Sequence, residues 1–247
     1  MRIVVIGGSG LIGSRVVGLL TEAGHEAVPR SRSTGVDLLS GRGLPEALAG
    51  ADVVVDLTKP PAFDDTSPAF FRATMGHLLA AAGSAGVGHA VILSIVGADQ
   101  VPGLAYYRSK VLQEDLLKAG PVPYSIVRST QFFEFVDTVL SWTSDEHTVR
   151  LPPTLLQPVA GDEVARVVAG VVVGTPLNGT IDLAGPEVFP LDELGRITLD
   201  ARGDRRAVVT DEDAGLYAAA KGHALVAGRG AVIAATTYRD WLARRPH

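Results

Sequence analysis

Short apolar runs alternate with longer segments of helical periodicity along the first part of the chain. Continuous apolar runs are typical of strands covered on both faces, and apolar spacings of three and four are typical of helices. Repeated β-α-β units favour a parallel sheet with helices on both faces, joined by right-handed crossovers. We therefore expect a Rossmann-type, doubly wound α/β fold. The pattern predicts strands over residues 3–6, 26–30, 53–57, 91–96 and 124–128, and helices over residues 11–23, 44–48, 67–85, 106–119 and 132–144.

The alternation of apolar runs and helical segments becomes irregular after about residue 145, where Pro152, Pro153 and Pro158 interrupt the chain. We expect a single domain over residues 1–247, with a core over residues 1–145 and a smaller, irregular lobe over residues 146–247. In this lobe the pattern predicts a helix with Asp162 as its N-cap, a strand over residues 180–183, and helices over residues 191–201 and 238–243.

Composition excludes several classes of protein. The chain has 247 residues, a formal net charge of −5 and no cysteine, which excludes disulfides and cysteine nucleophiles. Nucleic-acid binding is not expected, because it requires clustered positive charge. The first apolar run ends at Gly7 and is too short for a signal peptide. Glycines interrupt the uncharged stretch over residues 73–98, which argues against a membrane span. We expect a cytoplasmic protein with no nucleic-acid or membrane partner, as a monomer or homodimer.

A glycine-rich loop connects the first predicted strand to the first predicted helix. Such a turn needs small residues, because backbone N–H groups must approach a pyrophosphate at the helix N-terminus. In a chain with 28 glycines the bare pattern is weak, and its position at the first strand–helix junction is what favours phosphate binding over a simple turn. The loop contains Gly7, Gly8, Ser9, Gly10, Leu11, Ile12 and Gly13.

The residues after the second predicted strand indicate which dinucleotide binds. An NAD site usually carries a carboxylate there, whereas an NADP site offers arginine to the 2′-phosphate. In this chain Arg30, Ser31 and Arg32 follow the strand, and no carboxylate is present. The planar guanidinium can bind two phosphate oxygens at once. NADP(H) is favoured, and a solvated basic loop is the alternative interpretation.

Tyr106 and Lys110 lie one helical turn apart on the same predicted helix face. A nearby ammonium lowers the pKa of a tyrosine, which makes the phenol usable as an acid or a base. Ser94 precedes Tyr106 by twelve residues, near the strand end where open α/β sheets bind ligands, and its hydroxyl is placed to hold a substrate carbonyl. An amphipathic surface helix and a buried strand serine are the alternative interpretations.

The order Ser94, Tyr106 and Lys110 resembles the catalytic set of the short-chain dehydrogenase/reductase superfamily, and the glycine spacing resembles its extended and atypical branches. Further stretches are similar to the atypical, NmrA-like NAD(P)H-binding group, and the resemblance covers nearly the whole chain. Many members of that group lack the Tyr/Lys pair and act as NADP-sensing regulators, so its retention favours catalysis. The similar stretches are residues 24–25, 93–97, Glu114, 124–128, 131–133 and 185–187.

The resemblance also implies which further residues contact the cofactor. Arg30, Ser31 and Arg32 would meet the 2′-phosphate, and Asp37 and Leu38 would border the adenine. Lys59 stands where relatives often have asparagine or alanine. The residues that would line the adenosine ribose and pyrophosphate are Thr58, Lys59 and Pro60, and those that would edge the nicotinamide are Ser129, Thr130 and Gln131.

Other polar and aromatic residues carry weaker signals. The histidines show no metal-ligand spacing, so no metal site is expected, and His147 is the one histidine placed near the predicted substrate lobe. Phe132, Phe133 and Phe135 are candidates for the wall of a substrate pocket, although an aromatic helix face is more often core.

These observations predict an NADPH-dependent reductase or dehydrogenase that transfers hydride to a carbonyl or conjugated carbonyl of a small molecule. Ser94 would orient the carbonyl, Tyr106 would donate a proton, and Lys110 would hold the nicotinamide ribose. Two alternatives stay open: a non-catalytic NADP(H)-sensing regulatory protein, and an isomerase or epimerase that uses the nicotinamide transiently. The few lysines and abundant alanine, glycine and valine favour a bacterial source.

Overall fold

The computed structural model describes residues 1–244 and contains the expected parallel sheet. Seven strands are hydrogen-bonded in the order β2-β1-β3-β4-β5-β8-β11. β1 lies between β2 and β3, and its residues Ile3–Ile6 are buried, as the continuous apolar run predicts. The strands are β1 Arg2–Ile6, β2 Glu26–Arg30, β3 Val53–Asp56, β4 His89–Ile95, β5 Tyr124–Ser129, β8 Gly179–Ala184 and β11 Val232–Ile233.

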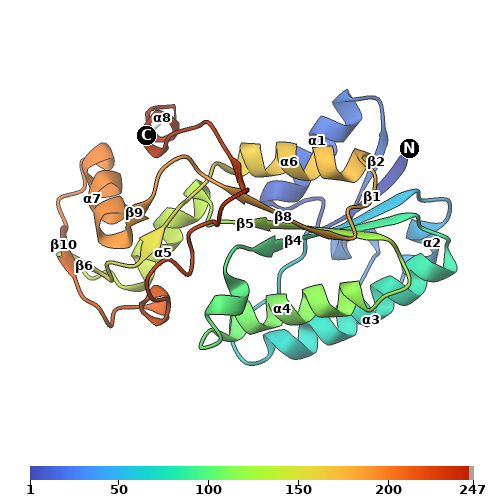
Figure 1. Ribbon diagram of the computed structural model, residues 1–247, viewed down its shortest axis with the longest axis horizontal. Helices are drawn as coiled ribbons and strands as arrows, with labels where there is room; N and C mark the ends of the chain where they lie inside the picture. Colours follow the sequence, from blue (N-terminus) through green and yellow to red (C-terminus); the bar gives the residue numbers. More distant parts are fainter. Residues whose placement is uncertain (245–247) are drawn as a thin grey trace. The chain divides into compact units, whose positions relative to one another are not determined.

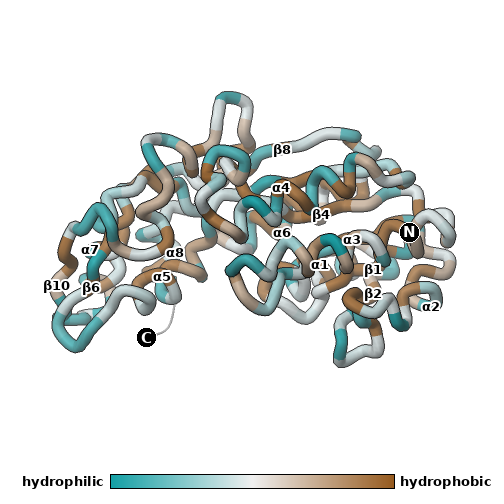
Figure 2. Tube along the Cα trace, turned by 90° about the horizontal axis from the view of Figure 1, so that it is seen from below, coloured by the Kyte–Doolittle hydropathy of each residue, from teal (hydrophilic) through white to brown (hydrophobic). Residues whose placement is uncertain are grey.

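Helices cover both faces of this sheet, which confirms the doubly wound α/β fold. In Figure 1, α1 and α6 lie on one side of the strands, and α3 and α4 lie together on the other side. The tube in Figure 2 is brown along β1 and β4, where the apolar strand residues lie between the helical layers. The helices are α1 Leu11–Glu22, α2 Leu44–Leu48, α3 Ser67–Ser84, α4 Ala105–Lys118 and α6 Gly161–Val173.

The chain forms two compact units built from interleaved segments. The first unit contains residues 1–95, 105–128 and 164–181. It therefore includes the glycine loop and α4, with Tyr106 and Lys110. The second unit contains residues 96–104, 129–163 and the chain from Asp182 onward.

The second unit is held by two short strand pairs and a set of aromatic contacts. The Phe133 ring lies 5.0 Å from the Tyr238 ring, and the Tyr238 hydroxyl hydrogen-bonds the Thr198 hydroxyl at 2.8 Å. Gln157 donates to the Gly185 carbonyl and accepts from the Ala227 amide, which ties separate segments together. The elements are β6 Thr148–Leu151 paired with β10 Ala207–Thr210, β7 Leu155–Leu156 paired with β9 Phe189–Pro190, and helices α5 Val136–Trp142, α7 Leu191–Arg202 and α8 Tyr238–Ala243.

Two predictions about this region are wrong in detail. The helix expected over residues 132–144 is divided into a 3₁₀ turn, Phe133–Phe135, and the shorter α5. Asp162 is not the N-cap of α6: the helix begins at Gly161, whose amide donates to the Glu134 carboxylate at 3.0 Å. Asp162 occupies the first helical turn, where a carboxylate interacts favourably with the helix dipole.

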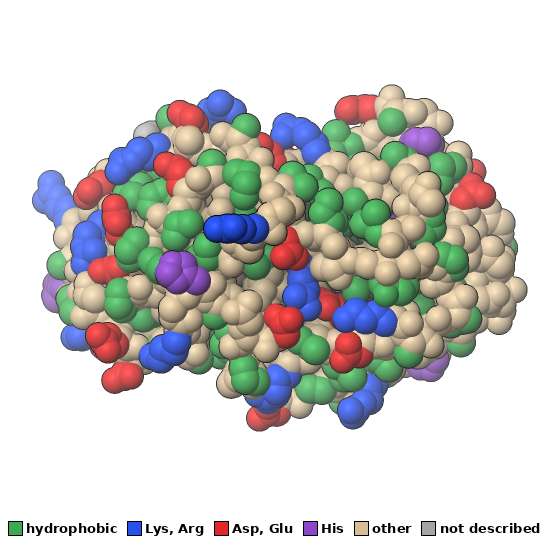
Figure 3. All heavy atoms as spheres, in the orientation of Figure 1, with side chains coloured by type: hydrophobic (Ala, Val, Ile, Leu, Met, Phe, Trp, Pro, Cys, Tyr) green, Lys and Arg blue, Asp and Glu red, His purple; other side chains and the backbone are tan. Residues whose placement is uncertain are grey.

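Acidic and basic side chains are mixed on the surface shown in Figure 3, without a broad area of one sign. Among residues 1–244, no helix has the length and apolar character needed to cross a membrane.

Candidate cofactor and catalytic site

The turn between β1 and α1 is packed so closely that its backbone leaves no room for side chains. Gly7 has φ +78°, its amide donates to the Arg30 carbonyl at 2.9 Å, and its carbonyl accepts from the Gly10 amide at 2.9 Å. A Cβ added at Gly13 would lie 2.1 Å from the Gly7 carbonyl oxygen. A Cβ added at Gly8 would lie 2.7 Å from the Cβ of Pro29. Gly8 and Gly13 are therefore both required by the packing of the turn.

The N-terminus of α1 offers uncapped backbone donors at this turn. Gly10 is the N-cap residue, no side chain caps the helix, and the first turn carries no acidic residue. Leu11 is exposed and Ile12 is buried, so the end of the loop is attached to the core through the Ile12 side chain. Backbone N–H groups and the helix dipole together favour an anion at such a terminus. The loop therefore fits the pyrophosphate of a dinucleotide.

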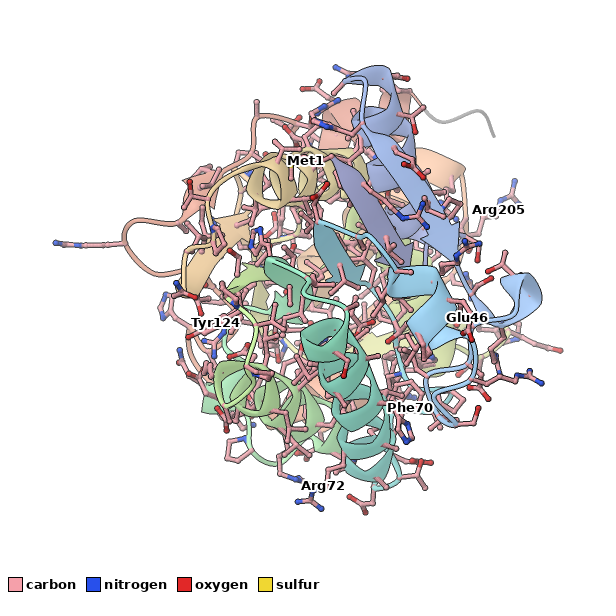
Figure 4. The ribbon with its side chains drawn as sticks, turned by 90° about the vertical axis from the view of Figure 1, so that its right-hand side faces the viewer. Met1, Glu46, Phe70, Arg72, Tyr124 and Arg205 are labelled. Carbon is pink, nitrogen blue, oxygen red and sulfur yellow. The ribbon has the colours of Figure 1, made fainter. Side chains whose placement is uncertain are left out.

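Arginines gather at the carboxyl end of β2. A hollow of about 420 Å³ there is lined by Arg30, Thr34, Arg42 and the α2 residue Glu46, which Figure 4 labels. The Nε atom of Arg30 is buried and has no hydrogen-bond partner among the described residues. An unsatisfied buried guanidinium nitrogen favours an anionic ligand, because leaving such a donor unpaired costs free energy.

The hydroxyl residues after β2 serve the local turn. The Ser31 amide donates to the Thr34 hydroxyl at 2.8 Å, and the Ser31 and Ser33 hydroxyls are 2.7 Å apart. These contacts place Arg32 in a short 3₁₀ turn with its side chain exposed. The turn presents Arg32 to solvent beside Arg30.

Asp37 and Leu38 shape the segment that follows. The Asp37 carboxylate accepts hydrogen bonds from the Ser40 hydroxyl at 2.9 Å and the Leu39 amide at 3.0 Å, and these bonds lower its pKa. Leu38 is buried, and its carbonyl hydrogen-bonds His77 Nδ1 at 2.9 Å. Both predicted adenine-bordering side chains are thus engaged within the protein.

The segment after β3 is attached to the end of that strand by hydrogen bonds. Thr58 donates its amide and its hydroxyl to the Asp56 carboxylate, at 2.9 and 2.6 Å. The exposed Lys59 places its Nζ atom 5.8 Å from the Phe63 ring centre, and Pro60 is buried. Thr58 is therefore the member of the predicted Thr58-Lys59-Pro60 group with a polar contact to the β3 end.

Lys110 is buried on α4 and is held by several groups. Its Nζ atom donates to the Leu93 carbonyl at 2.6 Å and to the Gln113 side-chain carbonyl, and it lies 5.0 Å from the Phe71 ring centre. Burial lowers the pKa of Lys110 to about 8, although the Asp56 and Glu114 carboxylates favour the ammonium. Lys110 is therefore charged at neutral pH but close to titrating.

Tyr106 occupies the same helix one turn earlier, as the spacing predicts, and its environment differs from the expected one. Its ring lies 4.5 Å from the Phe63 ring and 6.3 Å from the Tyr107 ring. Desolvation raises the pKa of the Tyr106 phenol above its ordinary value, with a further contribution from Tyr107. Lys110 does not lower this pKa as expected, and its ammonium instead contacts Leu93, Gln113 and Phe71.

Ser94 is buried on β4 and donates its hydroxyl proton to the Glu114 carboxylate at 2.6 Å. Arg128 donates to both oxygens of the same carboxylate, at 2.9 and 2.8 Å. Burial of Glu114 opposes ionisation, but the hydrogen bonds from Arg128 and Ser94 hold the pKa of Glu114 below its ordinary value. Ser94 thus belongs to a buried ionic cluster that the motif spacing did not predict.

The remaining predicted residues lie in the second unit, where Ser129 and Thr130 make hydrogen bonds within the protein. Phe132 and Phe135, with Gln131, line a small apolar cavity. Phe133 is buried against Tyr238 and Trp241 as part of the core. His147 is exposed in a loop, where its amide donates to the Asp145 carboxylate. Within residues 1–244, no cluster of three histidine, aspartate or glutamate side chains could hold a metal ion.

The parallel sheet, the glycine turn and the uncapped helix define a dinucleotide-binding α/β protein. A sequence comparison agrees: the chain belongs to the NAD(P)H-binding family, whose model matches residues 7–173. This confirms the expected membership of an NAD(P)H-binding family, while the relation to the atypical short-chain dehydrogenases/reductases and to the NmrA-like subgroup stays a prediction. A comparison with curated proteins finds no match.

Solved structures show the same fold at low identity. MoeE5 in complex with UDP-glucose and NAD is 18% identical, with 98% of this chain and 96% of that chain covered and a TM-score of 0.75. A dTDP-4-dehydrorhamnose reductase ortholog from Clostridium acetobutylicum is 19% identical, with 87% and 86% covered and a TM-score of 0.70. The triphenylmethane reductase of Citrobacter sp. is 18% identical, with 85% and 79% covered and a TM-score of 0.69.

Substitution of Gly13 by alanine should disrupt the glycine turn. The added methyl overlaps the Gly7 carbonyl, so we expect a loss of about 3 kcal/mol in the free energy of unfolding and at least about a tenfold loss in NADPH affinity. Gly18→Ala is the matched control, because Gly18 lies on the same helix with nothing within 4 Å of the new Cβ. That variant should gain about 1 kcal/mol from helix propensity. Equal affinity in the two variants, measured by titration, would contradict the assigned role of the turn.

Proposed function

We propose that this protein is an NADPH-dependent oxidoreductase that reduces a carbonyl or conjugated carbonyl of a small molecule. One observation carries the proposal: the glycine turn and helix α4 lie within one compact unit. On α4, Tyr106 precedes the buried Lys110 by one helical turn. The turn fits a dinucleotide, and the helix supplies a proton donor and a cation. Membership of the NAD(P)H-binding family supports the same class of activity.

The arginines after β2 support NADP(H) as the cofactor. Arg30 and Arg42 line the hollow at the end of β2, and Arg32 is exposed beside it. Guanidinium groups suit the 2′-phosphate that distinguishes NADP(H). When bound, the nicotinamide supplies the hydride.

Tyr106 is the proposed proton donor to the substrate oxygen. Its raised pKa keeps the phenol protonated at neutral pH, and a general acid must carry its proton before the reaction. Lys110 has two of its three ammonium protons directed to Leu93 and Gln113, which leaves one for the ribose of the cofactor. In the proposed reduction, Tyr106 delivers the proton and Lys110 holds the ribose.

Ser94 can orient a substrate carbonyl only if its hydroxyl changes its hydrogen-bond partner. A hydroxyl carries one proton, and in the structure that proton is directed to Glu114. Ser94 would orient a substrate carbonyl only after that hydrogen bond is exchanged. We keep Ser94 as a candidate and assign the proton transfer itself to Tyr106.

Predicted substrate residues border a small apolar cavity of the second unit, which has room for about one water molecule. Phe132, Phe135 and Val139 contribute to its lining, and Gln131 adds an amide. Apolar walls with a few polar groups are typical of small-molecule sites. We propose that these side chains contact an apolar part of the substrate.

An epimerase is the second candidate, because solved structures with this fold include a UDP-N-acetylglucosamine 4-epimerase from Bacillus cereus. The same Tyr/Lys pair would serve it. The two functions differ in redox balance: a reductase consumes NADPH in proportion to product, whereas an epimerase forms product with no net consumption. Absorbance of NADPH, followed together with product formation, separates them.

Substitution of Tyr106 by phenylalanine should abolish turnover and preserve cofactor affinity. The variant removes the proton donor and keeps the ring that packs against Phe63, so we expect kcat to fall by about 100-fold or more. Tyr107→Phe is the matched control, because it removes a phenol from the adjacent position. Turnover on a panel of carbonyl compounds and NADPH titration give the two readouts. Undiminished turnover in Tyr106→Phe would refute the assignment.

Removal of the arginines after β2 should reduce the preference for NADPH. In the double variant Arg30→Gln, Arg32→Gln we expect the Kd for NADPH to rise by about tenfold or more, with little change for NADH, because only NADPH carries the 2′-phosphate. Arg72→Gln is the control: Arg72 is exposed on α3, as Figure 4 shows. An equal effect on NADPH and NADH would contradict 2′-phosphate recognition.

A further inference from the structure

A chain of three buried polar side chains connects the end of β3 to Lys110. Asp56 is 1% exposed, Gln113 is 0% exposed and Lys110 is 3% exposed. The Gln113 side-chain nitrogen donates to Asp56 Oδ2 at 3.0 Å, and the Gln113 side-chain oxygen accepts from Lys110 Nζ. A neutral amide therefore lies between a carboxylate and an ammonium in the core of the first unit.

The two charged groups select one orientation of the Gln113 amide. An ionised carboxylate only accepts hydrogen bonds, so it must face the NH₂ group, and an ammonium only donates, so it must face the carbonyl oxygen. Asp56 accepts two further bonds from Thr58, and all three contacts favour the carboxylate, whereas burial raises the pKa of Asp56. Each end of the chain thus reinforces the orientation that the other end requires.

This arrangement restricts where the Lys110 ammonium can lie. The Leu93 carbonyl and the Gln113 oxygen bind two of its protons, and the Phe71 ring covers it at 5.0 Å. Because Gln113 is itself held by Asp56, the ammonium is fixed by β3 and β4 as well as by its own helix. A buried polar network whose members hydrogen-bond one another restricts the geometry of each member.

We propose that Asp56, acting through the Gln113 amide, is a positioning residue that holds Lys110 in place and keeps it charged for catalysis. The inference rests on the proposed function, because it takes Lys110 as the cation that holds the ribose of the cofactor. Neither Asp56 nor Gln113 was a candidate from the sequence.

The charges around Lys110 define how removal of Asp56 would act. Asp56 on β3 and Glu114 on α4 are the carboxylates that favour the charged form of Lys110. Burial of Lys110 favours its neutral form instead. The Phe71 and Met75 side chains, from α3, are uncharged, and β4 contributes a backbone carbonyl. Because burial already lowers the pKa of Lys110 to about 8, loss of the Asp56 charge should bring its titration into the neutral range.

A direct test follows the titration of Lys110 in the full chain without cofactor. The sequence has few lysines, so [¹³C]lysine labelling gives a sparse NMR spectrum, and Lys110→Met assigns the signal. In Asp56→Asn we expect the midpoint to fall by at least about one pH unit, because the carboxylate is lost and the new amide donor faces the Gln113 NH₂ group. In Gln113→Glu we expect the midpoint to rise, because a carboxylate then contacts the ammonium directly.

Asp115→Asn is the matched control, because it removes the same charge from an exposed position on α4 and should leave the midpoint unchanged. The opposite shifts expected for Asp56→Asn and Gln113→Glu keep the test valid if one of the two variants folds poorly. Unchanged midpoints in both variants would overturn the proposal.

Kinetics connect the network to catalysis. In Asp56→Asn we expect the basic limb of the kcat profile to move to lower pH together with the NMR midpoint, and the loss to appear in kcat more than in the KM for the carbonyl substrate. A shifted NMR midpoint with an unshifted kcat profile would overturn the positioning role. Undiminished turnover in Tyr106→Phe and Lys110→Met would instead refute the proposed function, and the NMR titration would still report on the network.

Discussion

The architecture depends on one close contact of backbone with backbone, where the chain leaves β1 and enters α1. The Gly13 Cα lies so near the Gly7 carbonyl that a methyl group would sit 2.1 Å from that oxygen. This proximity directs the N-terminus of α1 to the carboxyl end of β1, while the Gly7 amide binds the last residue of β2. The place where a pyrophosphate would be held and the arginines after β2 are therefore fixed relative to each other by main-chain contacts.

The position of α4 depends on the polar and charged side chains that this helix buries. This helix buries Lys110, Gln113 and Glu114, which is unusual because buried ionic groups are costly unless they are paired. Glu114 is neutralised by Arg128 and accepts from Ser94, and Lys110 is linked through Gln113 to Asp56. The two clusters attach the helix to β3, β4 and β5, and so they set the position of Tyr106 on the same helix.

The sequence predicted six of the seven strands of the central sheet, because the inner strands β1, β3 and β4 contain continuous apolar runs and the helices between them have a regular period. It did not predict β11, which consists of two exposed residues. The β1–α1 turn and the α4 helix were located from residue spacing alone. The short strands β6, β7, β9 and β10 were not, because they contain two to four residues each and lie among prolines and loops. Asp162 was assigned as an N-cap from its residue type, whereas Glu134 from a distant segment binds the first amide of α6.

Residue spacing in the sequence predicted which residues belong to the candidate site, but not the contacts that they make. Motif order located Ser94, Tyr106 and Lys110, but spacing does not report which partner a hydroxyl or an ammonium takes. Asp56 and Gln113 are separated from each other by more than fifty residues, and neither belongs to a recognisable motif. Phe63, which raises no signal in the sequence, packs on the Tyr106 ring and contributes to an environment in which the phenol holds its proton.

The most direct test of the account is a fluorescence titration of the unmodified protein with NADPH and, separately, with NADH. We expect saturable binding of NADPH and at least about tenfold weaker binding of NADH, a difference that corresponds to about 1.4 kcal/mol. Binding of neither cofactor would mean that the glycine turn serves only the fold, and the proposed oxidoreductase activity would be contradicted. Equal binding of both would contradict the role given to Arg30 and Arg32.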